Sequence, residues 1–161
     1  MRIGIVSDTH GDQRAIKQVV AQAGPVDLWL HAGDHVRDAR FLGELTGLPV
    51  HMAAGNCDPR DAGLPDQFLT CEGHRLMLTH GHYYRVKDGL QELMWWGRQY
   101  EVDIVVFGHT HKPVICREED LLIINPGSPA LPRGGSFAAF AILELRPGEM
   151  SPAIVELKLS E

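Results

Sequence analysis

Residues 3–10 read Ile-Gly-Ile-Val-Ser-Asp-Thr-His, an apolar run that ends in an acidic residue and a histidine. Short β-branched runs of this kind are typical of strands buried on both faces of a sheet. Asp8 and His10 therefore directly follow a predicted strand over residues 3–6. The same arrangement, a predicted strand followed by metal-binding side chains, recurs along the chain.

Five further residues with metal-binding side chains stand where other predicted strands end. They are Asp34, Asn56, His80, His109 and His111. In open α/β sheets, ligands bind beyond the carboxyl ends of the strands, so we expect these side chains to converge. Carboxylate, imidazole and amide groups without a thiolate favour Mn, Fe, Ni or Zn over a cysteine-rich zinc site or an all-oxygen calcium site. The pattern predicts a binuclear metal site and hydrolytic chemistry.

The length and composition indicate one ordinary domain over residues 1–161. The chain is 44% hydrophobic and 22% charged, with a net charge of −6. A general nucleic-acid surface needs many Lys and Arg residues, so this charge argues against one. It does not exclude a phosphorylated substrate, because bound divalent metals are often the largest local charges in a site.

The sequence favours a cytoplasmic protein without a membrane anchor. No apolar run approaches the ~18 residues of a membrane span. The N-terminus leads straight into a predicted strand and lacks the layout of a signal peptide. Cys57, Cys71 and Cys116 cannot all pair within one chain, so a disulfide framework is not expected.

Strands alternate with helices in the first half of the chain, and hairpins dominate the second half. Asp12 is a predicted N-cap of the first helix, which ends at Gly24-Pro25. Later predictions include a helix over 86–100 and two antiparallel strands over 137–145 and 153–159. This order favours two packed sheets with outer helices over a single doubly wound sheet. No G-x-G-x-x-G or Walker-type motif supports a nucleotide cofactor.

Five ordered motifs together resemble a known family. They are D-x-H, G-D, G-N-x-D, H-G-H and G-H-T-H, and they are similar to those of the calcineurin-like metallophosphoesterase superfamily, in particular its small branch of YfcE-like phosphodiesterases. The resemblance extends from Asp8 to the segment Asn125-Pro-Gly-Ser128. It implies an α/β fold, a four-layer α/β/β/α sandwich of two mixed β-sheets flanked by helices.

The resemblance also implies a role for each motif residue. Asp8, His10 and His111 resemble the ligands of one metal ion, and Asn56, His80 and His109 those of a second, with Asp34 bridging the two. The implied catalytic residues are Asp34, Asn56, Cys57 and His80. The implied cofactor is two divalent ions per chain, Mn²⁺ first, with Ni²⁺, Fe²⁺ or Zn²⁺ as alternatives.

These residues predict a metal-dependent phosphodiesterase that hydrolyses small phosphodiesters through a hydroxide bridging two divalent ions. The ions carry more positive charge than Asp8 and Asp34 cancel, which suits a phosphate group. A phosphomonoesterase or nucleotide hydrolase with the same site is one alternative. A non-catalytic protein-binding scaffold of the same fold is another. The expected partner is a small phosphodiester, and a homo-oligomer is a family-level expectation.

Cys57 departs from the larger superfamily. Many members have histidine directly after the ligand asparagine, where it assists the leaving group or steadies the phosphate. A thiol has an unperturbed pKa of about 8.5 and is a poor substitute as an acid near neutrality. We therefore expect slow hydrolysis of alkoxide esters and a relative preference for acidic leaving groups such as nitrophenolate.

Several other polar residues have two interpretations each. His82 and Arg133 are candidate substrate-binding residues, or else ordinary loop side chains. Asp38 either orients a ligand imidazole or acts as a carboxylate at a helix N-terminus. We expect His35 to point away from Asp34 if the chain is extended there. The remaining histidines His31, His51 and His74 are expected to be structural.

Overall fold

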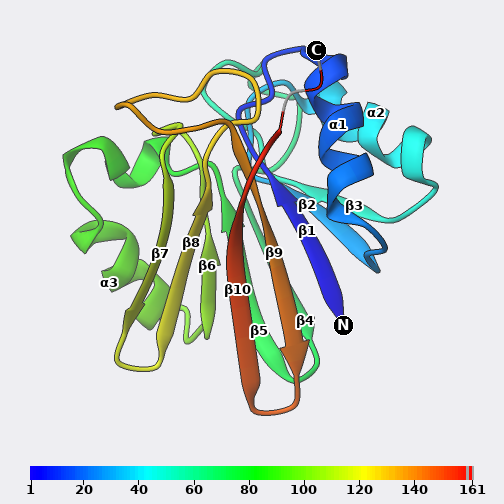
Figure 1. Ribbon diagram of the computed structural model, residues 1–161. Coiled ribbons are helices and arrows are strands. Elements are labelled where there is room, and N and C mark those ends of the chain that lie inside the picture. The colour runs from blue at the N-terminus through cyan, green and yellow to red at the C-terminus, as the bar shows by residue number, and fades with distance from the viewer. Residues whose placement is uncertain (159, 161) are drawn as a thin grey trace.

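The computed structural model describes residues 1–158 and 160 and consists of two five-stranded sheets packed face to face. The first sheet has the order β10-β9-β1-β2-β3 and the second β4-β5-β6-β8-β7. Two helices cover the outer face of the first sheet and one covers the second (Figure 1). The predicted four-layer α/β/β/α sandwich is therefore confirmed.

The first sheet combines parallel and antiparallel strands. Its members are β1 (Arg2–Val6), β2 (Leu28–His31), β3 (Val50–Met52), β9 (Ala139–Arg146) and β10 (Glu149–Glu156). The first three run parallel to one another, and β9 pairs antiparallel with both β1 and β10. The carboxyl ends of β1, β2 and β3 therefore lie at the same edge of the sheet.

The second sheet is also mixed. Its members are β4 (Asp66–Cys71), β5 (His74–Thr79), β6 (Ile104–Val106), β7 (Pro113–Glu118) and β8 (Leu121–Pro126). β5, β6 and β8 are parallel, whereas β4 and β7 run antiparallel at the edges. Figure 1 shows that the loops after the parallel strands of both sheets gather at the top of the view.

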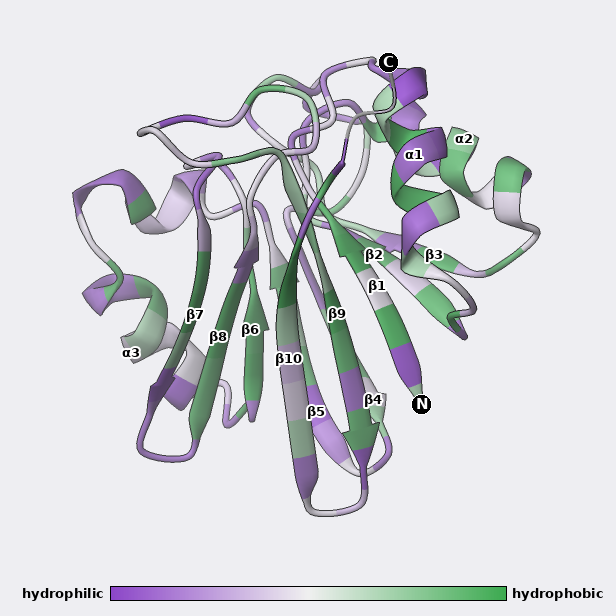
Figure 2. Ribbon diagram, viewed as in Figure 1, coloured by the Kyte–Doolittle hydropathy of each residue, from purple (hydrophilic) through white to green (hydrophobic). Residues whose placement is uncertain are grey.

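The residues of β1 explain why the strand is buried on both faces. Ile3 and Ile5 belong to the core between the two sheets. Val6 faces the opposite way and packs in the cluster beneath the helices, together with Trp29. Gly4 lies opposite Trp29 in the register, and a Cβ at that position would collide with the indole ring. Figure 2 shows the hydrophobic residues of the central strands running between the layers.

Helices α1 (Gln13–Ala23) and α2 (Val36–Thr46) cover the first sheet. Asp12 caps α1 as predicted, because its carboxylate accepts a hydrogen bond from the Ala15 amide at 2.9 Å. Gly24, with φ of 69°, ends the helix. No helix among residues 1–158 and 160 combines the length and apolar character needed to cross a membrane.

The prediction of one helix over residues 86–100 is wrong. The segment consists of the short 3-10 turn η2 (Val86–Asp88) and helix α3 (Gln91–Gln99), preceded by the turn η1 (His82–Tyr84). Gly89 separates the two, because its φ of 132° is incompatible with a helix. Leu93 and Gly97 of α3 are buried against the second sheet.

The bounds of the last hairpin also differ from the prediction. β9 begins at Ala139, and β10 runs from Glu149 to Glu156, so it starts four residues before the predicted strand. β10 lies at the edge of its sheet, the position where a strand tolerates a proline such as Pro152. Leu159, the predicted end of this strand, lies outside the described residues.

Candidate metal centre

The backbone turns sharply between the ends of the strands and the candidate ligands. Five of these residues have positive φ angles: Asp8 at 56°, His10 at 47°, Asp34 at 60°, His109 at 70° and His111 at 57°. Non-glycine residues adopt this left-handed conformation rarely, and it costs about 1–3 kcal/mol per residue. Strained backbone concentrated at one edge of the sandwich is typical of a functional site.

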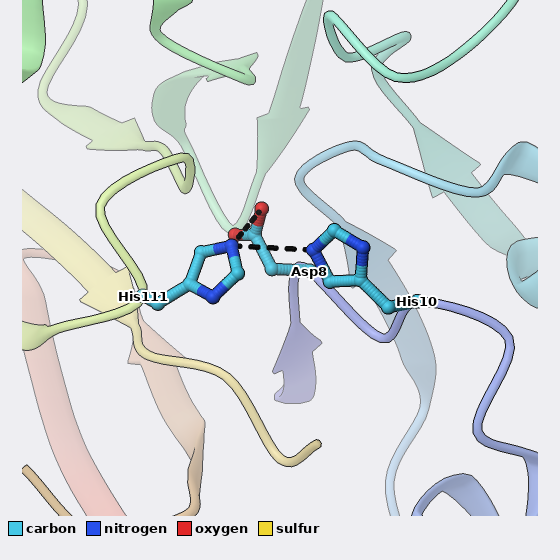
Figure 3. A group of neighbouring side chains, drawn as sticks. All are labelled: Asp8, His10 and His111. Atoms are coloured by element: carbon cyan, nitrogen blue, oxygen red, sulfur yellow. Dashed lines mark hydrogen bonds and ion pairs between the residues drawn. The ribbon is translucent and has the colours of Figure 1, made fainter. Parts of the chain in front are cut away.

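Asp8, His10 and His111 form the first group of converging side chains (Figure 3). The Nε2 atom of His111 lies 3.3 Å from Oδ1 of Asp8. The same nitrogen lies 3.2 Å from Nε2 of His10. Asp8 and His10 follow β1 of the first sheet, whereas His111 follows β6 of the second. The group therefore joins the two sheets at their common edge.

Asp8, Asp34 and His80 form the second group. Nε2 of His80 lies 3.5 Å from Oδ1 of Asp34 and 3.8 Å from Oδ1 of Asp8. It also lies 3.0 Å from Oδ1 of Asn56, which therefore belongs to the same cluster. The three residues of this group are almost completely buried, whereas Asn56 is exposed.

Asp34 lies between the two groups. Its Oδ1 faces His80, while Oδ2 is 3.9 Å from Nε2 of His10. The two oxygens of this carboxylate therefore face different groups. Asp8 also belongs to both groups, through Oδ1.

His109 lies beside these groups without belonging to either. Its backbone amide donates to Oδ2 of Asp8 at 3.0 Å. Its imidazole ring is 5.0 Å from the ring of His80, centroid to centroid. The structure thus brings six of the seven predicted ligands into direct side-chain contact and places the seventh ring next to them.

Backbone carbonyls fix the orientation of two imidazoles. Nδ1 of His80 lies 2.7 Å from the Ala32 carbonyl oxygen, and Nδ1 of His111 lies 2.6 Å from that of Leu131. A carbonyl oxygen only accepts, so Nδ1 carries the proton in both rings. The Nε2 atoms then face the carboxylates of the site, the arrangement found in histidines that bind metals.

The carboxylate of Asp8 provides a test of whether a metal fits. Its Oδ2 accepts from Ser7 Oγ at 2.6 Å and from the His109 amide, whereas its fully buried Oδ1 has no hydrogen-bond partner. A buried carboxylate oxygen is normally paired. Because Oδ1 faces the ring nitrogens of both His80 and His111, a divalent cation bound there would satisfy it. The residues therefore fit a metal ion.

The electrostatics of the site keep both carboxylates ionised. Burial alone would raise the pKa of Asp8, but contacts with His111 and His80 hold the pKa below its ordinary value. The pKa of Asp34 is lowered too, against burial, by hydrogen bonding and charge from His80. Burial, the charge of His80 and that of Lys87 lower the pKa of His109 to about 4. Burial would lower the pKa of His80, but Asp34 and Asp8 raise it, so a divalent ion bound there would take the place of its Nε2 proton.

Glycines of the motifs allow the close approach of the ligands. A Cβ at Gly108 would lie 2.7 Å from Oδ2 of Asp8 and would also collide with Ser7. A Cβ at Gly55 would collide with the carboxylate of Asp34. The glycines before His109 and Asn56 are therefore required by space at the site.

Asp38 supports the loop that carries Asp8 and His10. Its buried carboxylate Oδ2 accepts from Thr9 Oγ1 at 2.5 Å and from the Gly11 amide at 2.8 Å. The Thr9 hydroxyl in turn contacts Nε2 of buried His31 at 2.9 Å. Although Asp38 lies in the first turn of α2, its hydrogen bonds go to this loop and not to a ligand imidazole.

His35 does not follow the expectation of an extended chain. Asp34 and His35 both have left-handed backbones, with φ of 60° and 64°. The ring of His35 consequently lies 5.1 Å from that of His10. The turn after β2 therefore places His35 at the border of the site.

The remaining candidates border the two groups. Cys57 is exposed, and its backbone amide donates to Oδ1 of Asp34 at 2.9 Å. The ring of His82 is 5.3 Å from that of His80, and this residue lines a cavity of about 250 Å³ together with Asn56. The Arg133 amide donates to the His111 carbonyl at 3.2 Å.

Sequence reasoning did not assign roles to several supporting residues. Ser7 donates to the Asp8 carboxylate, and Ser128 donates to the Asp8 carbonyl at 2.8 Å. Buried Asn125 donates to the Gly108 carbonyl and to Thr110 Oγ1, each at 3.0 Å. The only sequence signal for Asn125 and Ser128 was their position in the Asn-Pro-Gly-Ser segment.

Comparison with known proteins agrees with this geometry. The model of the calcineurin-like phosphoesterase superfamily domain matches residues 1–148. A probable metallophosphoesterase of Methanothermobacter thermautotrophicus is 40% identical over 140 residues, which cover 83% of this chain and 80% of the relative. The phosphodiesterase YfcE of Escherichia coli K12 is 36% identical over 173 residues, covering 89% and 88%.

A solved structure shares the fold. The crystal structure of a predicted phosphoesterase from Streptococcus pneumoniae superposes with a TM-score of 0.77 at 26% identity, covering 96% of this chain and 97% of the other. The chain belongs to the calcineurin-like phosphoesterase superfamily and is a hydrolase of phosphoric ester bonds.

Proposed function

We propose that the protein is a cytoplasmic phosphodiesterase that acts on small phosphodiesters with two divalent metal ions, Mn²⁺ first among them. The observation that carries this proposal is the buried, unpartnered Oδ1 of Asp8 between the ring nitrogens of His80 and His111. The relationship to YfcE, named a phosphodiesterase, supports a diester substrate.

The proposed ligands divide as the family resemblance implies. Asp8, His10 and His111 would hold one ion, and Asp34 would be shared with a second ion held by Asn56, His80 and His109. Divalent ions bound there would supply positive charge for the phosphate oxygens and lower the pKa of a nucleophilic water. The protein holds the ligand nitrogens in place through the carbonyls of Ala32 and Leu131.

Cys57 determines which leaving groups are favoured. Although Cys57 is exposed, partial loss of water around its thiol and the nearby carboxylate of Asp34 raise the thiol pKa, so the thiol stays protonated near neutral pH. A weakly acidic thiol transfers a proton to a departing alkoxide poorly. The proposal therefore includes a preference for diesters with acidic leaving groups.

Hydrolysis of bis-p-nitrophenyl phosphate by Mn²⁺-loaded protein tests the proposal. Asp34→Asn and His80→Ala should largely abolish turnover, whereas Lys17→Gln, an exposed change on α1, should retain it. Full activity in both site variants would remove the proposed mechanism. Faster hydrolysis of p-nitrophenyl phosphate than of its bis-ester would identify a phosphomonoesterase instead, and binding of a protein partner without turnover would indicate a scaffold.

A further inference from the structure

A second cavity lies beside the loop that carries His109 and His111. Its volume is about 530 Å³, a size that suits a small organic ligand. Thr110, between the two histidines, lines it, as does Arg133, whose amide is bonded to the His111 carbonyl. The cavity therefore borders the candidate metal centre on the side of the second sheet.

Three cations line this cavity. They are Lys87, Lys112 and Arg133, and no acidic residue is among the lining residues. Within residues 1–158 and 160, none of the three forms an ion pair within 4.0 Å. Lys87 is near enough to the metal centre to affect His109 electrostatically. Three unpaired positive charges gather here in a protein whose net charge is −6.

The rest of the cavity wall is apolar. Val86, Leu90, Phe107 and Val114 contribute to it. Val86 and Phe107 are buried parts of the core beneath α3, so this wall is anchored in the fold. An apolar wall with cations beside it suits a ligand that has both an apolar or heteroaromatic body and an anionic group.

We propose that this cavity binds one arm of the phosphodiester, and that this arm carries a heteroaromatic body and a second phosphate. The inference rests on the proposed phosphodiesterase activity and specifies its substrate class. A phosphate carries nearly two negative charges at neutral pH. It therefore matches three unpaired cations more closely than a singly charged carboxylate does. Thr110 and the backbone of Arg133 connect this subsite to the loop of His109 and His111.

Two chromogenic diesters that differ only in the second phosphate test the subsite. The first is the p-nitrophenyl ester of thymidine 5′-phosphate, and the second is the same compound with a 3′-phosphate. The Mn²⁺-loaded protein should hydrolyse the second with a kcat/KM about tenfold higher, the effect of one charge-assisted hydrogen bond. This ratio is insensitive to changes in the metal centre that affect both probes equally.

The cationic residues should account for the preference. Replacing Lys87, Lys112 and Arg133 with glutamine should reduce the ratio to near one, and each single replacement should give an intermediate ratio if the triple variant does not fold. Lys17→Gln, which removes one positive charge elsewhere as each single replacement does, should keep the ratio of the wild type. A wild-type ratio of one, or a ratio unchanged in the variants, would overturn the subsite while leaving the phosphodiesterase proposal intact.

If neither probe is hydrolysed, binding measurements distinguish the proposed subsite from the proposed phosphodiesterase activity. That outcome would contradict the phosphodiesterase activity itself. Calorimetry with thymidine 3′,5′-bisphosphate and thymidine 5′-phosphate then measures the subsite without turnover. Tighter binding of the bisphosphate by about tenfold, lost in the glutamine variants, would support the subsite. Equal affinity for the two nucleotides would overturn it.

Discussion

The Nε2 atoms of His10 and His111 lie 3.2 Å apart, although the residues are separated by 101 positions in the sequence. One follows a strand of the first sheet and the other a strand of the second. Because the Leu131 carbonyl holds the proton of His111 on Nδ1, the Nε2 lone pair of His111 faces His10. A cation between these rings would tie the edges of the two sheets together.

Metal binding should therefore stabilise the folded protein. Ligands that bind only the native state stabilise it by about 2.7 kcal/mol at a concentration 100 times the dissociation constant. We expect Mn²⁺ to raise the Tm of chelator-treated protein, and His111→Ala to show a smaller rise. Thermal unfolding with and without Mn²⁺ measures both, and Lys17→Gln is the matched control. An equal rise in wild type and His111→Ala would argue against a metal at this position.

Asp38 should act on the metal centre through the Thr9–Gly11 loop. Asp38→Asn keeps the size of the side chain but weakens its acceptance from Thr9 and Gly11. Loss of such supporting partners typically lowers metal affinity or activity about 10–100-fold. Titration with Mn²⁺, followed by activity, should show weaker Mn²⁺ binding in Asp38→Asn. A high Mn²⁺ concentration should restore part of the lost activity. Glu44→Gln on the exposed side of the same helix is the control, and identical titrations for the two variants would contradict this role.

Gly108→Ala should disturb the Asp8 carboxylate directly. The added Cβ would lie 2.7 Å from Oδ2 of Asp8, so the carboxylate or its loop must shift. We expect weaker Mn²⁺ binding and loss of hydrolysis in a protein that still folds. Gly43→Ala is the matched control, because its Cβ makes only ordinary contact in α2 and alanine favours a helix by about 1 kcal/mol. Comparable metal affinity in the two variants would show that the space at Gly108 is not needed.

His31 should make the protein less stable in acid. Its burial lowers the pKa to about 4, against an ordinary value of 6.5. Between these values the unfolded chain binds a proton that the folded protein does not, so stability falls as pH decreases. Linkage gives a loss of about 2 kcal/mol between pH 7 and pH 5 from this group. Urea unfolding at both pH values measures it, and His31→Gln should lose correspondingly less. An equal loss in both proteins would contradict burial of a neutral His31.

Local sequence pattern was sufficient to predict most of the layer arrangement. The β-branched run before Asp8 and the Asp12 cap each determine structure within a few residues, so the sequence alone reveals them. The break at Gly89 was missed because a single glycine within an apolar helical pattern is compatible with a continuous helix.

The support of the site depends on contacts between distant segments. Asp38 and Ser128 reach the Asp8 loop from elsewhere in the chain, and no local spacing indicates such partners. Lys87 and Lys112 likewise come together only in the folded chain, where both line the same cavity. Ligand residue types were predictable from motifs, whereas supporting residues and the cationic cavity required the folded structure.

The most direct test of the central proposal is the stoichiometry of metal required for turnover. Protein freed of metal with a chelator is titrated with Mn²⁺ while bound ions and hydrolysis of bis-p-nitrophenyl phosphate are measured together. The proposed site predicts no turnover without metal and full turnover at two ions per chain, with Asp34→Asn failing to reach it. Full turnover by metal-free protein, or with one ion per chain, would contradict the binuclear site.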